Sequence, residues 1–127
     1  KDHSFIPLTV DHKPTERCEI DMIKEKKSFV SSDRTAGILA VSRSLGDLHI
    51  SGVGRVPDMS CHFRNEKDYR LVICCDGVFD VLENEDVANV ISQVDDVDEQ
   101  ACLIRNTAYS KGSQDNISVI VVDIVLK

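Results

Sequence analysis

Two aspartates occupy positions from which their carboxylates could act together on a metal ion. Asp76 ends an apolar run and is followed by Gly77, whereas Asp115 and Asn116 lead into a second apolar run. If the two runs form neighbouring antiparallel strands, both carboxylates lie at the same end of the pair. Gly77 removes side-chain bulk beside Asp76, so water or a second ion could approach.

A third aspartate, Asp11, follows a short extended run at residues 6–10. An all-oxygen ligand set suits Mg²⁺ or Mn²⁺ and disfavours zinc and copper. Two such ions about 3.5–4 Å apart would hold a bridging water, lower its pKa and direct it at phosphorus. Position alone leaves the ordinary alternative open, because Asp-Gly after a strand is a common turn and Asp before a strand a common cap.

These residues would be positioned by a small set of strands. Strands are predicted at residues 28–30, 37–41, 59–63, 69–75 and 117–126. The run 71–75 is apolar on both faces, which is typical of a buried strand. Residues 42–58 hold three of the six glycines and predict a loop.

Three helices are predicted beside these strands. Pro14 suits the first turn of a helix that ends near Glu25, with its Ile20, Ile23 and Cys18 side chains facing inward. Apolar residues at positions 87, 90, 91 and 94 have helical spacing. Asp96 and Glu99 have capping-box spacing before a further helix, which Gly112 would end. Strands and helices segregate along the chain, which favours an α+β fold.

Composition excludes several classes of function. The net charge of −7 and the lack of a basic face argue against nucleic-acid partners. No apolar run approaches the roughly 20 residues that cross a bilayer, so no membrane insertion is expected. The five cysteines are odd in number and lack C-x-x-C spacing, which indicates reduced thiols. We therefore expect an intracellular monomer, located in the cytoplasm, the nucleus or both.

Five sequence blocks, taken in order, resemble the second half of the metal-dependent Ser/Thr protein phosphatases of the PP2C (PPM) family. The blocks are LTVDHKP at 8–14, GILAVSRSLGD at 37–47, VPD at 56–58, CDGVFDV at 75–81 and GSQDNISVIVV at 112–122. Each block alone is a modest signal, but five in the family's order across nearly the whole chain are specific.

The resemblance implies an α-β-β-α sandwich, in which two antiparallel sheets pack face to face with helices outside. It implies that Asp76 and Asp115 bind a catalytic pair of Mg²⁺ or Mn²⁺ ions. Asp11 would belong to a third metal site that Asp76 shares. No side chain acts as a covalent nucleophile in this family. Metal-activated water attacks phosphoserine or phosphothreonine in phosphoprotein substrates.

Other polar residues in the blocks have two readings. Ser42, Arg43 and Asp47 could take part in catalysis, but hydrogen bonds that hold the loop are favoured. His12 could be a general acid, and a structural turn histidine is favoured. Where the family has a Gly-Gly pair this chain has Lys27 and Ser28, so a looser or differently shaped turn is expected there.

The family's first half is absent from these 127 residues, including its Asp-Gly-His-Gly-Gly loop. Residues 1–127 are therefore expected to be the C-terminal portion of a single phosphatase domain, inactive alone and partnered by the missing N-terminal half. The alternative is a pseudophosphatase or regulatory binding module with the same fold. A small acidic metal-binding domain is a third reading, which the five ordered blocks disfavour.

Overall fold

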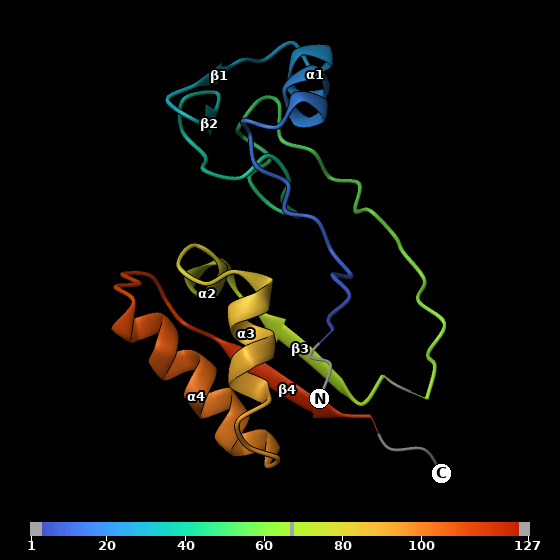
Figure 1. The fold of residues 1–127 in the computed structure, drawn as a ribbon. Helices are drawn as coiled ribbons and strands as arrows, with labels where there is room; N and C mark the ends of the chain where they lie inside the picture. Colours follow the sequence, from blue (N-terminus) through green and yellow to red (C-terminus); the bar gives the residue numbers. More distant parts are fainter. Residues whose placement is uncertain (1–3, 67, 125–127) are drawn as a thin grey trace. The chain divides into compact units, whose positions relative to one another are not determined.

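The computed structural model describes residues 4–66 and 68–124, which form two compact units (Figure 1). Unit 1 holds the described residues up to Pro7 and from His62 onward, and unit 2 is Leu8–Cys61. The elements in chain order are α1 (Arg17–Glu25), β1 (Val30–Ser31), β2 (Arg34–Thr35), β3 (Arg70–Cys74), α2 (Asp76–Phe79), α3 (Asn84–Ile91), α4 (Val97–Ser110) and β4 (Val119–Asp123). Helices and small antiparallel sheets are both present, so the predicted α+β class is confirmed.

Unit 1 is built on the antiparallel pair β3–β4, whose register runs from Arg70 opposite Asp123 to Cys74 opposite Val119. Helix α4 packs against this pair, and α3 packs against α4 (Figure 1). The buried core consists of Val78, Leu82, Val87, Val90, Ile91, Ile104 and Ala108. Because alternate strand residues face opposite sides, Val72 and Cys74 contact this core, whereas Ile73 is 51% exposed. The expectation that residues 71–75 are buried on both faces is therefore wrong for this chain.

The ends of α4 follow the sequence signals. Asp96 is its N-cap, and one carboxylate oxygen accepts a hydrogen bond from the Glu99 backbone N–H at 2.9 Å. Gly112 has a φ of +94° just beyond the helix, which confirms the predicted left-handed C-cap. Inside the helix, Gln100 is 1% exposed and its amide donates to the carbonyls of Ile91 and Val94. The connection between α3 and α4 is thereby fixed to the core.

The two short strands of unit 2 differ from the strands predicted at residues 28–30 and 37–41. β1 and β2 pair antiparallel around Ser32 and Asp33, whose φ values are +51° and +59°. Two left-handed residues are what a tight two-residue hairpin loop requires. The predicted strand 37–41 is wrong, because Ala36 and Gly37 also have positive φ and break the extended chain; only an isolated bridge between Thr35 and Leu39 remains.

Further boundaries also changed. Residues 59–63 and 6–10 are irregular, so the predicted edge strand is wrong. The final strand, predicted at residues 117–126, is β4 at Val119–Asp123. The predicted end at residues 125–126 lies outside the described residues. α1 begins at Arg17 rather than at Pro14, which lies in the preceding turn. On α1 the inward residues are Glu19 and Ile23, with Ile20 half-buried, whereas Cys18 is exposed.

The expected looser turn at Lys27 is also wrong. Lys27 has a φ of +59°, its N–H donates to the Lys24 carbonyl, and the Ser28 N–H donates to the Ile23 carbonyl. These two bonds define a Schellman turn, in which the left-handed position is usually glycine. The chain keeps the tight turn and places a lysine in it.

The five cysteines differ in exposure, since Cys18, Cys61 and Cys102 are exposed whereas Cys74 and Cys75 are half-buried. All five are free thiols. Burial raises the pKa of Cys74 to about 11, with a smaller contribution from Cys75, so Cys74 remains a neutral core residue. Within residues 4–66 and 68–124, no helix has the length and apolar character needed to span a bilayer.

Candidate metal-binding site

The pairing of β3 with β4 brings Asp76 and Asp115 to one end of unit 1. The ladder ends where Cys74 lies opposite Val119, and one further bond runs from the Cys75 N–H to the Ser118 carbonyl at 3.2 Å. Asp76 follows this end of β3, and Asp115 precedes this end of β4. The antiparallel arrangement expected of the two aspartate-bearing strands is confirmed.

Gly77 lies directly against the segment that carries Asp115. A Cβ atom added to Gly77 would lie 2.2 Å from the carbonyl oxygen of Asn116 and 3.4 Å from the Cβ of Asp115. The first distance is far below van der Waals contact, so only glycine fits here. The predicted neighbours of the site, Gly77 and Asn116, therefore touch each other through their backbones.

Both carboxylates are oriented by the residue that follows them. One oxygen of Asp76 accepts from the Gly77 N–H at 3.0 Å, and one oxygen of Asp115 accepts from the Asn116 N–H at 2.6 Å. Both aspartates are exposed, and within the described part of the chain their second oxygens have no hydrogen bond. Each carboxylate thus presents one oxygen that a ligand could take.

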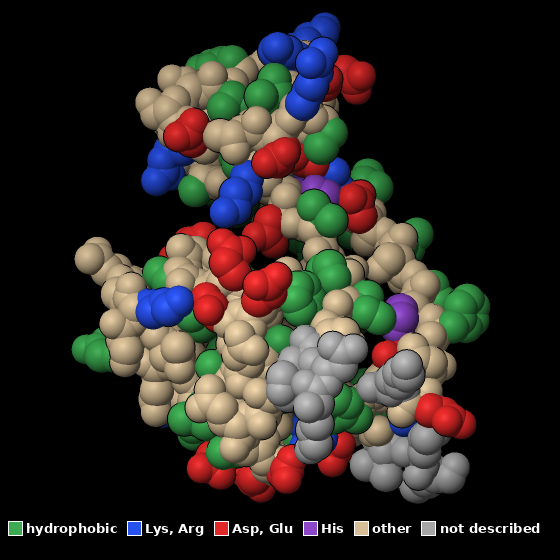
Figure 2. Space-filling model, viewed as in Figure 1, with side chains coloured by type: hydrophobic (Ala, Val, Ile, Leu, Met, Phe, Trp, Pro, Cys, Tyr) green, Lys and Arg blue, Asp and Glu red, His purple; other side chains and the backbone are tan. Residues whose placement is uncertain are grey.

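Asp76 lies in a helix that the sequence analysis missed. It is the first residue of α2, a single turn whose Gly77 and Val78 are buried. Asp80 follows one turn later, and its N–H donates to the Asp76 carbonyl at 2.8 Å. Residues four apart share a helix face, so this spacing was the available signal for a further acidic neighbour. Figure 2 shows acidic side chains gathered over the part of unit 1 where α2 lies.

The donor set fits a hard divalent cation in part. Carboxylate oxygens are the ligands that Mg²⁺ and Mn²⁺ prefer. Among residues 4–66 and 68–124, however, no three His, Cys, Asp or Glu side chains are grouped so as to hold a metal ion. Asp76 and Asp115 can therefore supply part of a metal site. Asp11 lies in unit 2, where it is exposed, and its assignment to a third metal site stays a prediction.

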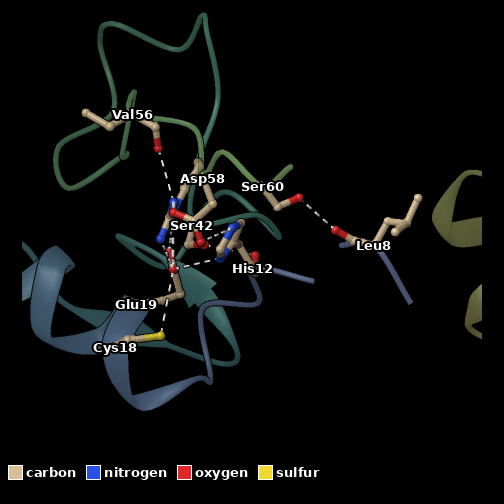
Figure 3. A network of polar contacts seen from close by, with 9 residues as sticks. Leu8, His12, Cys18, Glu19, Ser42, Val56, Asp58 and Ser60 are labelled. Atoms are coloured by element: carbon tan, nitrogen blue, oxygen red, sulfur yellow. Dashed lines mark hydrogen bonds and ion pairs between the residues drawn. The ribbon is translucent and has the colours of Figure 1, made fainter. Parts of the chain in front are cut away.

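Unit 2 contains an ion network around the buried carboxylate of Glu19, which includes Arg43 and His12 (Figure 3). Glu19 is 0% exposed and receives Arg43 at both oxygens, with Nη2 at 2.6 Å from Oε1 and Nε at 3.1 Å from Oε2. Arg43 also donates to Asp58 at 2.7 Å and to the Val56 carbonyl at 3.1 Å. His12 bridges the same two acids, with Nδ1 3.0 Å from Glu19 and Nε2 3.2 Å from Asp58.

The contacts in this network shift the pKa values of Glu19, Asp58 and Arg43. Burial alone would raise the pKa of Glu19, but the hydrogen bonds from Arg43, together with the charges of Arg43 and His12, bring it below its usual 4.5. The hydrogen bond from Arg43 also lowers the pKa of Asp58. Both carboxylates in turn raise the pKa of Arg43, first through the bond to Glu19.

These contacts favour the structural reading of the polar residues. The Ser42 hydroxyl donates to the His12 carbonyl at 2.9 Å, and Arg43 joins α1 to the segment at Asp58. Both ring nitrogens of His12 face carboxylates, as expected of a structural histidine. Asp47 has a φ of +53°, and its carbonyl closes a turn with the Ile50 N–H.

Comparisons with known proteins agree with the order of the motifs. The family model described as protein phosphatase 2C matches residues 1–117. Protein phosphatase 2C homolog 1 of Saccharomyces cerevisiae is 32% identical over 119 residues, which cover 92% of this chain and 42% of the yeast protein. Protein phosphatase 1B of Rattus norvegicus is 34% identical over 128 residues, covering 90% of this chain and 33% of the rat protein.

A solved structure gives the same result for the fold. The crystal structure of a phosphatase from Toxoplasma gondii matches with a TM-score of 0.82 and 28% identity, over 98% of this chain and 45% of that one. The chain thus spans less than half the length of each of these three relatives. Its fold is that of the phosphatases it matches, and the chain belongs to the protein phosphatase 2C family.

Proposed function

We propose that this chain supplies Asp76 and Asp115 as ligands for Mg²⁺ or Mn²⁺ in an enzyme that hydrolyses phosphoserine and phosphothreonine in proteins. The observation that carries the proposal is the contact between the two aspartate-bearing segments. Gly77 meets the Asn116 carbonyl, and each carboxylate keeps one oxygen without a hydrogen bond in the described structure. Membership of the phosphatase family supports the reaction class.

The chain's own residues would bind and orient. Asp76 and Asp115 would hold the cation, and the N–H groups of Gly77 and Asn116 fix the direction of each carboxylate. When bound, a divalent cation supplies Lewis acidity and a water molecule of lowered pKa. Side chains from this segment need not form a covalent bond to phosphorus.

The same site would be incomplete within this segment. Mg²⁺ prefers about six oxygen ligands, and two carboxylates supply only part of that shell. We therefore propose that the remaining protein ligands come from elsewhere in the whole protein and that this segment alone does not turn over substrate. Asp11 is retained in the proposal as the ligand of a third, weaker site.

The test uses the full-length protein that contains this chain. Mn²⁺-dependent phosphate release from a phosphothreonine peptide and the Mn²⁺ dissociation constant are measured for Asp76→Ala and Asp115→Asn. Both variants should weaken Mn²⁺ binding at least tenfold and lower turnover in proportion, because a neutral group balances less of the cation's charge.

A matched control is Asp98→Asn, which removes the same charge from an exposed position in the first turn of α4. That variant should bind Mn²⁺ as the unsubstituted protein does. If Asp76→Ala were equally active and bound Mn²⁺ equally well, the metal assignment would be refuted. Tight Mn²⁺ binding without phosphate release would instead favour a regulatory module that kept the fold and the metal.

A further inference from the structure

Two side chains join the Asp76 segment to the Asp115 segment. The Ser113 hydroxyl donates to the carbonyl of Gly77 at 2.6 Å. The Cys75 thiol lies 3.0 Å from the carbonyl of Asn116, to which it donates. Both bonds run from a side chain on one segment to a backbone carbonyl on the other.

The two links enclose both aspartates. Ser113 precedes Asp115 by two residues and reaches the residue just after Asp76. Cys75 immediately precedes Asp76 and reaches the residue just after Asp115. The Cys75 sulfur also accepts from the Ser118 N–H at 3.1 Å, so it is held on both sides.

The position of these links matters because the strand ladder has already ended. The last ladder pair is Cys74 with Val119, and beyond it the single backbone bond from Cys75 to Ser118 continues the pairing. Regular sheet pairing therefore does not extend to Asp76 or Asp115. Beyond that bond, the side chains of Ser113 and Cys75 add two hydrogen bonds between the segments.

We propose that Ser113 and Cys75 are positioning residues that set the separation and direction of the Asp76 and Asp115 carboxylates for a divalent cation. The proposal rests on the proposed function, since it concerns the same two carboxylates. Residues that orient metal ligands act through the ligands, and their loss costs about 10–100-fold in metal affinity. Neither side chain needs to touch the cation.

The first test compares Ser113→Ala with Ser113→Thr in the full-length protein, using the Mn²⁺ dissociation constant and the melting temperature without metal. Ser113→Ala should weaken Mn²⁺ binding about tenfold, and Ser113→Thr, which keeps the hydroxyl, should recover most of that loss. The matched control is Ser92→Ala. The Ser92 hydroxyl also donates to a backbone carbonyl, that of Asn89 at 2.7 Å, but at the end of α3. Ser92→Ala should leave the Mn²⁺ dissociation constant unchanged.

A second pair keeps the test decisive if Ser113→Ala folds poorly. Cys75→Ala removes the thiol, whereas Cys75→Ser keeps a donor of similar size, so only Cys75→Ala should weaken Mn²⁺ binding by about tenfold. Unchanged Mn²⁺ affinity in both Ser113→Ala and Cys75→Ala, with a large loss in Asp76→Ala, would overturn this inference and leave the proposed function standing. Unchanged affinity in Asp76→Ala as well would overturn both.

Discussion

Arg43 binds the buried carboxylate of Glu19 through both carboxylate oxygens, although the two residues are 24 positions apart in the chain. The remaining donors of the same guanidinium reach Asp58 and the Val56 carbonyl. One side chain therefore joins α1 to both ends of the loop at residues 42–58. A planar fork suits this task, because it can bind several acceptors at fixed angles.

Removing this cation should destabilise unit 2 strongly. Arg43→Met leaves the buried carboxylate of Glu19 without its guanidinium partner, and breaking a buried ion pair in this way costs about 3–5 kcal/mol. Arg43→Lys should lose part of this free energy of unfolding, because an ammonium cannot bind both Glu19 oxygens and Asp58 in the same geometry. Urea unfolding and hydrogen exchange of the α1 amides measure the loss. Arg34→Met is the control, because among the described residues the exposed side chain of Arg34 donates to the Ile38 carbonyl alone. An equal effect there would contradict the assignment.

Protonation of Glu19 in acid should remove the stabilisation that the same network supplies. The pKa of Glu19 is lower in the folded chain than its usual 4.5, so the unfolded state binds a proton more readily. The stabilisation is therefore complete above about pH 4.5 and is lost as the pH falls through the folded-state pKa. In Glu19→Gln the free energy of unfolding should fall less steeply with acid below this pH, as measured by urea unfolding across the range. An unchanged slope would show that Glu19 does not contribute to acid sensitivity.

The paired strands and the two aspartates at their ends could be predicted because the signals were local. Apolar runs of strand length ended and began at carboxylates, and antiparallel pairing then brought Asp76 and Asp115 together. The helix α2 was missed because a four-residue helix that opens with Asp-Gly has the composition of a turn. The strand predicted at residues 37–41 failed because Ala36 takes a positive φ, which its residue type does not signal.

The burial of Glu19 could not be predicted from the sequence, for a different reason. A glutamate in the first turn of a helix is typical of an exposed residue near the positive end of the helix dipole. Its burial depends on Arg43 and His12, which approach it only in the folded chain. Periodicity within α1 contains no information about those partners. It therefore predicts Cys18 on the inward face, where the structure has Glu19.

Lys27 offers a stabilising substitution. In the Schellman turn after α1 its left-handed backbone costs about 1–2 kcal/mol for a residue with a Cβ, whereas glycine avoids this cost but loses more entropy on folding. Lys27→Gly should therefore raise the free energy of unfolding by about 1 kcal/mol, measured by urea unfolding. Lys27→Ala keeps the Cβ and should show no such gain. Equal effects of the two substitutions would mean that the side chain, rather than the backbone conformation, determines stability at this position.

Gly77 should be intolerant of a methyl group, because the added Cβ would meet the backbone of the Asp115 segment. In Gly77→Ala the new Cβ would stand 2.2 Å from the Asn116 carbonyl oxygen, so the Asp76 and Asp115 segments must separate. Overpacking of this kind costs about 1–3 kcal/mol, and the displaced carboxylates should bind Mn²⁺ at least tenfold more weakly in the full-length protein.

Gly112→Ala is the matched comparison. Its φ of +94° makes alanine unfavourable by about 1–2 kcal/mol, yet in the described part of the chain no heavy atom other than those of its chain neighbours lies within 4 Å of the added Cβ. Both variants should therefore lower the melting temperature, and only Gly77→Ala should raise the Mn²⁺ dissociation constant. Weakened binding in both would assign the effect to general instability instead of to the contact between Gly77 and Asn116.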